Sequence, residues 1–225
     1  MFYIVIFLKI IMKKTTIAVI LIILLSFAIG IYSYQNIKED RVASHWNIDG
    51  NVNGYLPKFW GIFLLPMILI GLYLLFLFIP KIDPLKKNIQ RFRKYYDSFI
   101  LIIILFLFYV FILTILSNFG YIFNMTKILI PAIGLLFFYI GIIMKKLKRN
   151  WFIGIRTPWT LSNDEVWEKT HKLASVLFKT AGIILFFSIL FPSKYFLWFI
   201  LVPIFIIIVW LVLYSYLEYK KIKKQ

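Results

Sequence analysis

Six long apolar runs constrain the fold of this 225-residue chain more than any other feature. They cover residues 11–34, 61–79, 98–116, 127–144, 175–191 and 195–217. A helix that crosses a bilayer needs roughly 20 apolar residues, so each run is about long enough to span. Hydrophobic residues make up 62% of the sequence, which excludes an ordinary soluble protein. The expected fold class is all-α: a polytopic membrane helix bundle of about six transmembrane helices, forming a single membrane domain over residues 1–225.

The first run can be interpreted in two ways. Lys13 and Lys14 precede an apolar core, as in a secretory signal peptide, but the core is long and no small-residue cleavage site follows it. We therefore expect an uncleaved helix. Met12-Lys13-Lys14 is typical of the start of an inserted helix, so two native starts, Met1 and Met12, stay open.

The positive charges are distributed unevenly between the loops. The formal net charge is +17, and Lys and Arg concentrate in the N-terminal segment, at 80–97, at 145–174 and in the C-terminal tail. Because positive loops stay on the cytoplasmic side, these segments and both termini are expected in the cytoplasm. The charges flank spans and would face lipid headgroups, so the lipid bilayer is the expected partner and direct nucleic-acid binding is not expected.

The loop at 35–60 is expected on the outer face and is rich in aromatic, amide and turn-forming residues. Its candidate functional residues are His45, Trp46, Asn47, Gly50, Gly54, Tyr55 and Lys58. Asp49-Gly50 and Asn53-Gly54 predict two successive tight turns. Two interpretations stay open: a small compact cap, or a loop folded back on the bilayer with its aromatic rings at the interface.

The cytoplasmic loop at 145–174 is the densest in polar residues. Its candidate functional residues are Gly154, Arg156, Thr157, Pro158, Trp159, Trp167, Thr170 and His171. Ser162 and Glu165 form the pattern of a capping box, which predicts a helix that starts near Asn163 and continues into the fifth span. On this helix Trp167, Thr170, His171 and Ala174 share one face.

The charged residues of this region suggest two further contacts. Arg156 could pair with Asp164, Glu165 or Glu168, since an arginine at the membrane interface generally has a carboxylate, a carbonyl or a lipid phosphate as its partner. Lys179 in the fifth span either extends its amine to the interface or marks a functional position.

Catalytic chemistry has little support in the sequence. The chain has no cysteine, which excludes disulfides and thiol catalysis. It also lacks a Ser-His-Asp pattern, an HExxH motif and a glycine-rich phosphate loop. His45 and His171, the two histidines, are predicted on opposite sides of the membrane and cannot share a metal ion. We therefore expect no enzyme activity, no catalytic residues, no metal and no cofactor.

Two segments resemble known families. The run from Gly154 to Leu161 (GIRTPWTL), followed by Val166-Trp167 and Thr170-His171, resembles the signature of the SdpI family, membrane immunity proteins against a secreted antimicrobial peptide. The loop at 35–60, with His45-Trp46-Asn47 and Gly54-Tyr55, is similar to a domain of unknown function that often precedes that signature.

The resemblance implies immunity to a toxin peptide that meets the outer face. It also implies signalling of the toxin's presence, by holding a cytoplasmic transcriptional repressor at the inner face. The alternatives are a small-solute transporter, or a membrane enzyme acting on lipid-linked substrates with Arg156, Asp164, Glu165 and His171 in one pocket.

Overall fold

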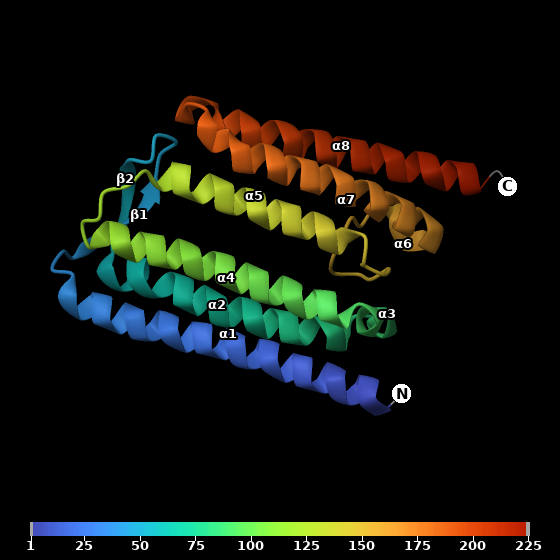
Figure 1. The fold of residues 1–225 in the computed structure, drawn as a ribbon, viewed down its shortest axis with the longest axis horizontal. Helices are drawn as coiled ribbons and strands as arrows, with labels where there is room; N and C mark the ends of the chain where they lie inside the picture. Colours follow the sequence, from blue (N-terminus) through green and yellow to red (C-terminus); the bar gives the residue numbers. More distant parts are fainter. Residues whose placement is uncertain (1, 224–225) are drawn as a thin grey trace. The chain divides into compact units, whose positions relative to one another are not determined.

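A computed structural model describes residues 2–223, with side chains from Lys14 onward (Figure 1). Its elements in chain order are α1 (Phe2–Asn36), β1 (Arg41–Trp46), β2 (Val52–Pro57), α2 (Lys58–Ile82), α3 (Lys86–Arg91), α4 (Arg93–Asn118), α5 (Met125–Met144), α6 (Pro158–Ser162), α7 (Asp164–Phe187), two 3₁₀ turns (Ser188–Leu190 and Ser193–Tyr195) and α8 (Phe196–Ile222). The two possible starts, Met1 and Met12, lie outside the residues whose side chains are described.

The expectation of six spans is confirmed. Within the described residues, six helical segments are long and apolar enough to cross a membrane: Lys14–Asn36, Lys58–Ile82, Arg93–Asn118, Met125–Met144, Asp164–Leu190 and Ser193–Ile222. The helix predicted to start near Asn163 and to continue into the fifth span is also confirmed, because α7 is one continuous helix from Asp164. Many large apolar side chains on these helices, such as Leu24, Leu75 and Phe205, are exposed and suited to contact lipid.

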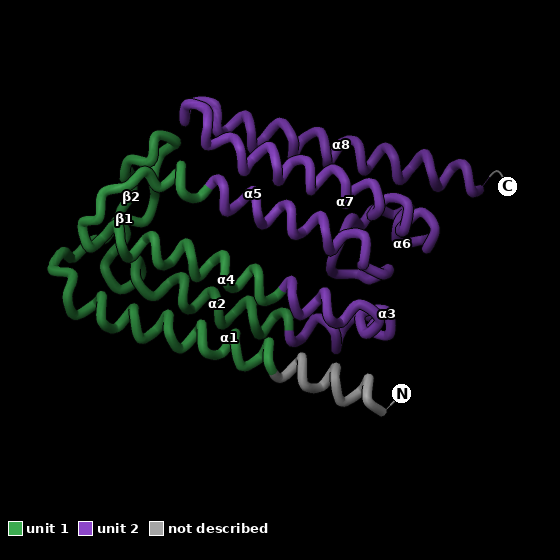
Figure 2. The backbone as a smooth tube through the Cα atoms, viewed as in Figure 1, with its two compact units in different colours: residues 1–76, 100–129 green, residues 77–99, 130–225 purple. Residues whose placement is uncertain are grey.

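The chain forms two compact units (Figure 2). The hairpin unit comprises Met1–Phe76 and Ile100–Leu129, and the motif unit comprises Leu77–Phe99 and Ile130–Gln225. The expectation that the whole chain acts as a single membrane domain stays a prediction.

In the hairpin unit, a two-stranded antiparallel sheet packs on the helices. Val42 of β1 is buried in an apolar cluster with Ile37, Ile62 of α2, and Phe111 and Ile115 of α4. Gly61 of α2 makes this packing possible, because a Cβ atom there would collide with the Val42 side chain. The hairpin is therefore anchored in the core of its own unit.

In the motif unit, small residues bring α5 and α7 close together. A Cβ atom on Gly182 of α7 would lie 2.5 Å from the backbone nitrogen of Phe138 in α5, and one on Gly134 would lie 2.6 Å from that of Phe186. At Gly141 the nearest atom belongs to the aliphatic chain of Lys179, which therefore lies against α5. Such small-residue contacts are typical of helix pairs in membranes, where close van der Waals packing replaces the hydrophobic effect.

The close approach of α5 and α7 at Gly182 can be tested by its effect on stability. Gly182→Ala should destabilise the protein by about 1–3 kcal/mol, because the backbone of α5 has to move away. Gly71→Ala is the matched control: Gly71 lies in α2 with no atom within 4 Å of the added carbon. There alanine should be neutral or slightly stabilising because of its higher helix propensity. Thermal unfolding in detergent, followed by circular dichroism, measures both; equal melting temperatures would contradict the close crossing.

Candidate functional site

The sequence-predicted residues fall into two sites, one in each unit. The first is the β1–β2 hairpin, in which Arg41 pairs with Pro57, Ala43 with Tyr55, and His45 with Gly54. The Asp49-Gly50 turn is confirmed: the Gly50 N–H donates to the Asn47 carbonyl at 2.9 Å, and Gly50 has a positive φ of 81° that favours glycine.

The second expected turn, Asn53-Gly54, is wrong. Both residues lie within β2, opposite His45, where a Cβ atom on residue 54 would come within 2.8 Å of the His45 Cβ. The glycine serves this close approach of the strands. The His45 ring contributes to closing the hairpin, since its Nδ1 lies 2.5 Å from the Asn53 Oδ1.

Polar side chains outside the hairpin hold it on the helices. The Asn118 amide, at the end of α4, accepts from the Ala43 N–H at 2.7 Å and donates to the Ala43 carbonyl at 3.0 Å. Thr126 of α5 donates to the Asn47 carbonyl at 3.0 Å, and Asn124 donates to that of Asp49 at 2.7 Å. The loop is thus a compact cap on its own unit. Sequence reasoning missed these three residues. The only feature of the sequence that points to them is that they are polar and lie in or next to the short connection between the third and fourth spans.

Lys58 joins the cap to α1. Its ammonium donates to the carbonyl of Ile37, just after α1, and lies 4.8 Å from the centre of the Tyr34 ring. Its backbone N–H donates to the Asp40 carbonyl at 2.8 Å. Tyr55, in contrast, is exposed on β2.

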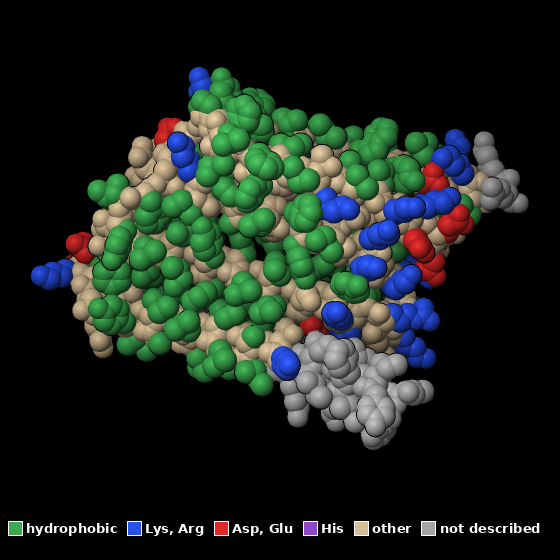
Figure 3. All heavy atoms as spheres, viewed as in Figure 1, with side chains coloured by type: hydrophobic (Ala, Val, Ile, Leu, Met, Phe, Trp, Pro, Cys, Tyr) green, Lys and Arg blue, Asp and Glu red, His purple; other side chains and the backbone are tan. Residues whose placement is uncertain are grey.

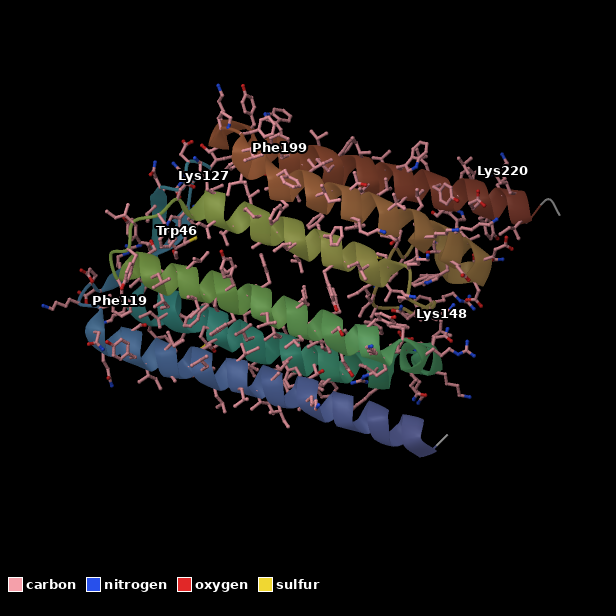
Figure 4. The ribbon with its side chains drawn as sticks, viewed as in Figure 1. Trp46, Phe119, Lys127, Lys148, Phe199 and Lys220 are labelled. Atoms are coloured by element: carbon pink, nitrogen blue, oxygen red, sulfur yellow. The ribbon has the colours of Figure 1, made fainter. Side chains whose placement is uncertain are left out.

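Beneath the hairpin lies a pocket of about 400 Å³. Trp46 and His45 line it from the hairpin, Trp60 from α2, Val110 and Thr114 from α4, and Met125 from α5. Figure 4 shows Trp46 on the side of the hairpin that faces these helices. The lining is mainly apolar with a few hydroxyl groups, a composition that suits an apolar side chain or chain segment.

In the motif unit, the segment after α5 is folded around the buried amide of Asn150. Its Nδ2 donates to the carbonyls of Lys148 and Ile153, both at 2.9 Å. Its Oδ1 accepts from the N–H groups of Phe152 at 2.9 Å and Ile153 at 2.7 Å. The amide therefore uses both donors and both lone pairs. Sequence reasoning did not select Asn150.

His171 holds the next part of this loop. Its Nε2 accepts from the Ile155 N–H at 3.0 Å, and its Nδ1 lies 2.8 Å from the Trp167 carbonyl. A neutral imidazole with its proton on Nδ1 satisfies both bonds. The ring stacks on Trp167 at a centroid distance of 4.0 Å, and the Trp167 indole N–H donates to the Leu147 carbonyl at 3.1 Å.

The predicted shared face is confirmed, because Trp167, Thr170, His171 and Ala174 are all buried. Gly154 passes directly over the imidazole with a φ of 116°, and a Cβ atom there would collide with Nε2. This glycine thus meets two demands at once, a left-handed backbone and a close approach.

The Thr157-Pro158 pair starts the short helix α6. The Thr160 N–H donates to the Thr157 hydroxyl at 3.1 Å, and the Thr157 N–H donates to the Thr160 hydroxyl at 2.9 Å, which makes a reciprocal cap with Pro158 in the first turn. The Thr157 hydroxyl also donates to Ser215 of α8 at 3.0 Å, and the Trp159 ring lies 5.1 Å from that of Tyr216. These contacts attach the loop to α8.

The capping box predicted at Ser162 and Glu165 is wrong. Ser162 is the last residue of α6, where its hydroxyl donates to the Trp159 carbonyl at 3.0 Å. Asn163 caps α7 instead, accepting from the N–H groups of Glu165 at 2.8 Å and Val166 at 3.1 Å. Asn163 directly precedes α7, so its side chain, rather than that of Ser162, reaches the free N–H groups of the first turn.

Of the partners considered for Arg156, the carbonyl is confirmed and the three carboxylates are wrong. Arg156 is exposed and donates to the Trp151 carbonyl at 2.6 Å. Arg149 pairs with Asp164 at 2.8 Å, and Lys169 pairs with Glu165 at 2.9 Å. Arg149 also donates to the Leu161 carbonyl at 2.7 Å, and Asn88 of α3 donates to the Arg149 carbonyl at 2.9 Å.

The pocket proposed for an enzyme is not assembled. Asp164 and His171 do line one cleft, of about 240 Å³, but Arg156 and Glu165 are not among its lining residues. Both His171 nitrogens are engaged with backbone groups, so the imidazole has no free position for a proton transfer.

Asp83 is a further residue that sequence reasoning missed. This buried carboxylate, at the end of α2, accepts from the Leu85 N–H at 2.6 Å and from the Trp151 N–H at 3.0 Å. Its only signal was an acidic residue in a strongly basic segment.

Comparison with known proteins supports both resemblances seen in the sequence. Residues 146–215 match the SdpI/YfhL protein family, and residues 21–70 match a domain of unknown function, DUF1648. The chain is 30% identical over 212 residues to "Immunity protein SdpI" of Bacillus subtilis (strain 168), an alignment that covers 94% of this chain and 98% of that protein. No solved structure matches the chain.

The contact between Gly154 and His171 can be tested by substitution. Gly154→Ala should destabilise the motif loop, because the added methyl group needs the imidazole to leave the Ile155 N–H. Gly120→Ala is the control: its φ of 88° imposes similar backbone strain, but no atom lies within 4 Å of the added carbon. Hydrogen exchange of the amides at 150–157 should accelerate in Gly154→Ala and stay as in wild type in Gly120→Ala. Equal exchange in all three proteins would contradict the role of the contact.

Proposed function

Because the chain belongs to the SdpI family, we propose that it is a membrane immunity protein that protects its own cell against a secreted antimicrobial peptide. The observation that carries the proposal is the 30% identity to an immunity protein over 94% of the chain, which includes both the hairpin and the motif loop. The structure supports a protein that acts by binding, because Thr157, Thr160 and His171 of the family signature are engaged in holding the motif loop.

We propose that the hairpin lies outside the cell, and that the motif loop and both termini lie in the cytoplasm. The distribution of Lys and Arg supports this orientation. In the motif unit, most of the visible Lys and Arg side chains gather around α3, α6 and the end of α8, while apolar side chains cover the helices (Figure 3). The peptide would then meet the hairpin first.

The pocket beneath the hairpin is the proposed contact site for the peptide. Peptides that act on membranes carry apolar side chains on one face, and a mainly apolar pocket of about 400 Å³ has room for such a side chain. Trp46 and Trp60 offer large rigid surfaces of the type that dominates binding energy at interfaces. Capture of the peptide here would keep it out of the bilayer.

A second proposed function is the relay implied by the family, in which the inner face holds a cytoplasmic transcriptional repressor. Support comes from an ordered charged surface: Lys169 of α7 lies 3.1 Å from Glu218 of α8, which also pairs with Lys221 at 2.7 Å. These pairs join two helix ends into one surface, as a protein partner requires. Its test is whether Glu218→Gln releases the repressor, measured as a fall in transcription of the repressed reporter, relative to wild type, when the peptide is present.

The alternatives have less support. A membrane enzyme would need the pocket that the structure does not assemble, and the similar protein of Bacillus subtilis is named for immunity rather than turnover. No feature of the described residues favours a small-solute transporter as specifically as the similarity to an immunity protein favours immunity.

The immunity proposal predicts the outcome of a survival assay. A sensitive host producing the chain should survive the secreted peptide fraction of the chain's own source. Val110→Phe, which fills the hairpin pocket from α4, should lower the tolerated peptide concentration by about tenfold, equivalent to ~1.4 kcal/mol of binding.

Val209→Phe is the control, because it makes the same change on an exposed position of α8. It should protect like wild type at equal membrane abundance. Failure of the wild-type chain to protect would contradict the immunity function. Full protection by Val110→Phe would contradict the proposal that the peptide binds in the hairpin pocket, but it would leave the immunity function standing.

A further inference from the structure

A basic cleft lies in the motif unit between α3, the segment after α5 and the start of α7. Its volume is about 240 Å³. Four cationic side chains line it, from Arg91, Lys145, Lys148 and Arg149, together with the carboxylates of Asp164 and Glu168. Figure 4 shows Lys148 on the loop that follows α5.

Three of the four cations are available to a ligand. Arg149 is occupied, since it pairs with Asp164 at 2.8 Å and donates to the Leu161 carbonyl at 2.7 Å. Arg91, Lys145 and Lys148 are exposed, and no carboxylate among the described side chains forms an ion pair with them. Because Asp164 is neutralised by Arg149, Glu168 is the one lining carboxylate that opposes these three charges.

The walls of the cleft are fixed before any ligand binds. Asn88 of α3 donates to the Arg149 carbonyl at 2.9 Å, and Trp167 of α7 donates to that of Leu147 at 3.1 Å. These bonds hold α3 and α7 to the same short loop. A ligand therefore gains contacts without the entropic cost of ordering the backbone.

The cleft also lies where spans end. Lys145 directly follows Met144, the last residue of the fourth span, and Arg91 precedes the third span, which begins at Arg93. Residues that flank spans lie at the depth of the lipid headgroups. Basic pockets between transmembrane helices at this depth suit anionic headgroups.

We propose that this cleft binds the phosphate group of an anionic phospholipid headgroup through Arg91, Lys145 and Lys148. Lysine and arginine are the side chains that bind phosphate by charge-assisted hydrogen bonds. Glu168 weakens the attraction and limits the cleft to a ligand of low negative charge, such as a phosphodiester. The inference is independent of the immunity function, because it concerns how the motif unit contacts its bilayer.

The test uses the full chain in nanodiscs made of equal parts of phosphatidylcholine and phosphatidylglycerol. Native mass spectrometry after release counts the lipids that remain bound. Wild type should retain phosphatidylglycerol, and a variant with Arg91→Gln, Lys145→Gln and Lys148→Gln should retain at least about tenfold less. Glu168→Gln should retain more than wild type.

The matched control carries Lys86→Gln, Lys87→Gln and Lys94→Gln, which remove the same charge from α3 and α4 outside the cleft. It should retain phosphatidylglycerol like wild type. Equal loss in the two triple variants would overturn the proposal in favour of diffuse attraction. Inorganic phosphate is tested separately, by thermal unfolding in lipid-free detergent. If it stabilises the protein while phosphatidylglycerol is not retained, the ligand is free phosphate and the lipid proposal is overturned.

Discussion

The satisfaction of backbone polar groups at the membrane is the constraint on which the rest of this structure depends. Six helices satisfy their own backbone groups and can face lipid. The segments that are not helical need other partners, and buried side chains supply them. Asn118 binds β1, Asn150 closes the loop after α5, and His171 binds the Ile155 N–H. An unmet buried backbone group would cost about 1–3 kcal/mol, so these few side chains determine the shape of both loops.

The same constraint explains the residues of the family signature. Gly154 allows the backbone to approach the His171 ring, Thr157 and Thr160 cap α6 reciprocally, and Trp167 binds the carbonyl of Leu147. Each of these contacts is internal to the motif unit. The surfaces open to ligands lie elsewhere, in the hairpin pocket and in the basic cleft, and they are lined largely by residues outside the signature.

The sequence predicted those parts of the fold that depend on local patterns. Run length predicted the six spans, and spacing along one helix predicted the shared face of Trp167 and His171. Bonds between residues far apart in the chain were not predictable. Asn118 binds Ala43 across a separation of 75 residues, and Asp83 binds Trp151 across 68. Such pairs leave no periodicity in a single sequence.

The remaining wrong predictions concern residues of the same type that lie close together in the sequence and could fill the same role. Ser162 and Asn163 are both good capping residues, and only the position at which α6 ends decided between them. Arg149 and Arg156 are both basic residues of the same loop, and the folded path of that loop, which a local pattern does not give, places Arg149 beside Asp164. The two strands were not predicted either, because turn residues indicated where the chain reverses but not what lies between the turns.

The proposed orientation, with the hairpin outside the cell and the motif loop inside, is tested most directly by thiol labelling, because the natural chain contains no cysteine. Asn51→Cys at the hairpin turn and Ser162→Cys at the end of α6 each place one thiol at an exposed position. A maleimide that cannot cross membranes should label Asn51→Cys in intact cells, and Ser162→Cys only after the cells are made permeable. Labelling of Ser162→Cys in intact cells, with Asn51→Cys protected, would contradict the orientation and with it the encounter of the peptide at the hairpin.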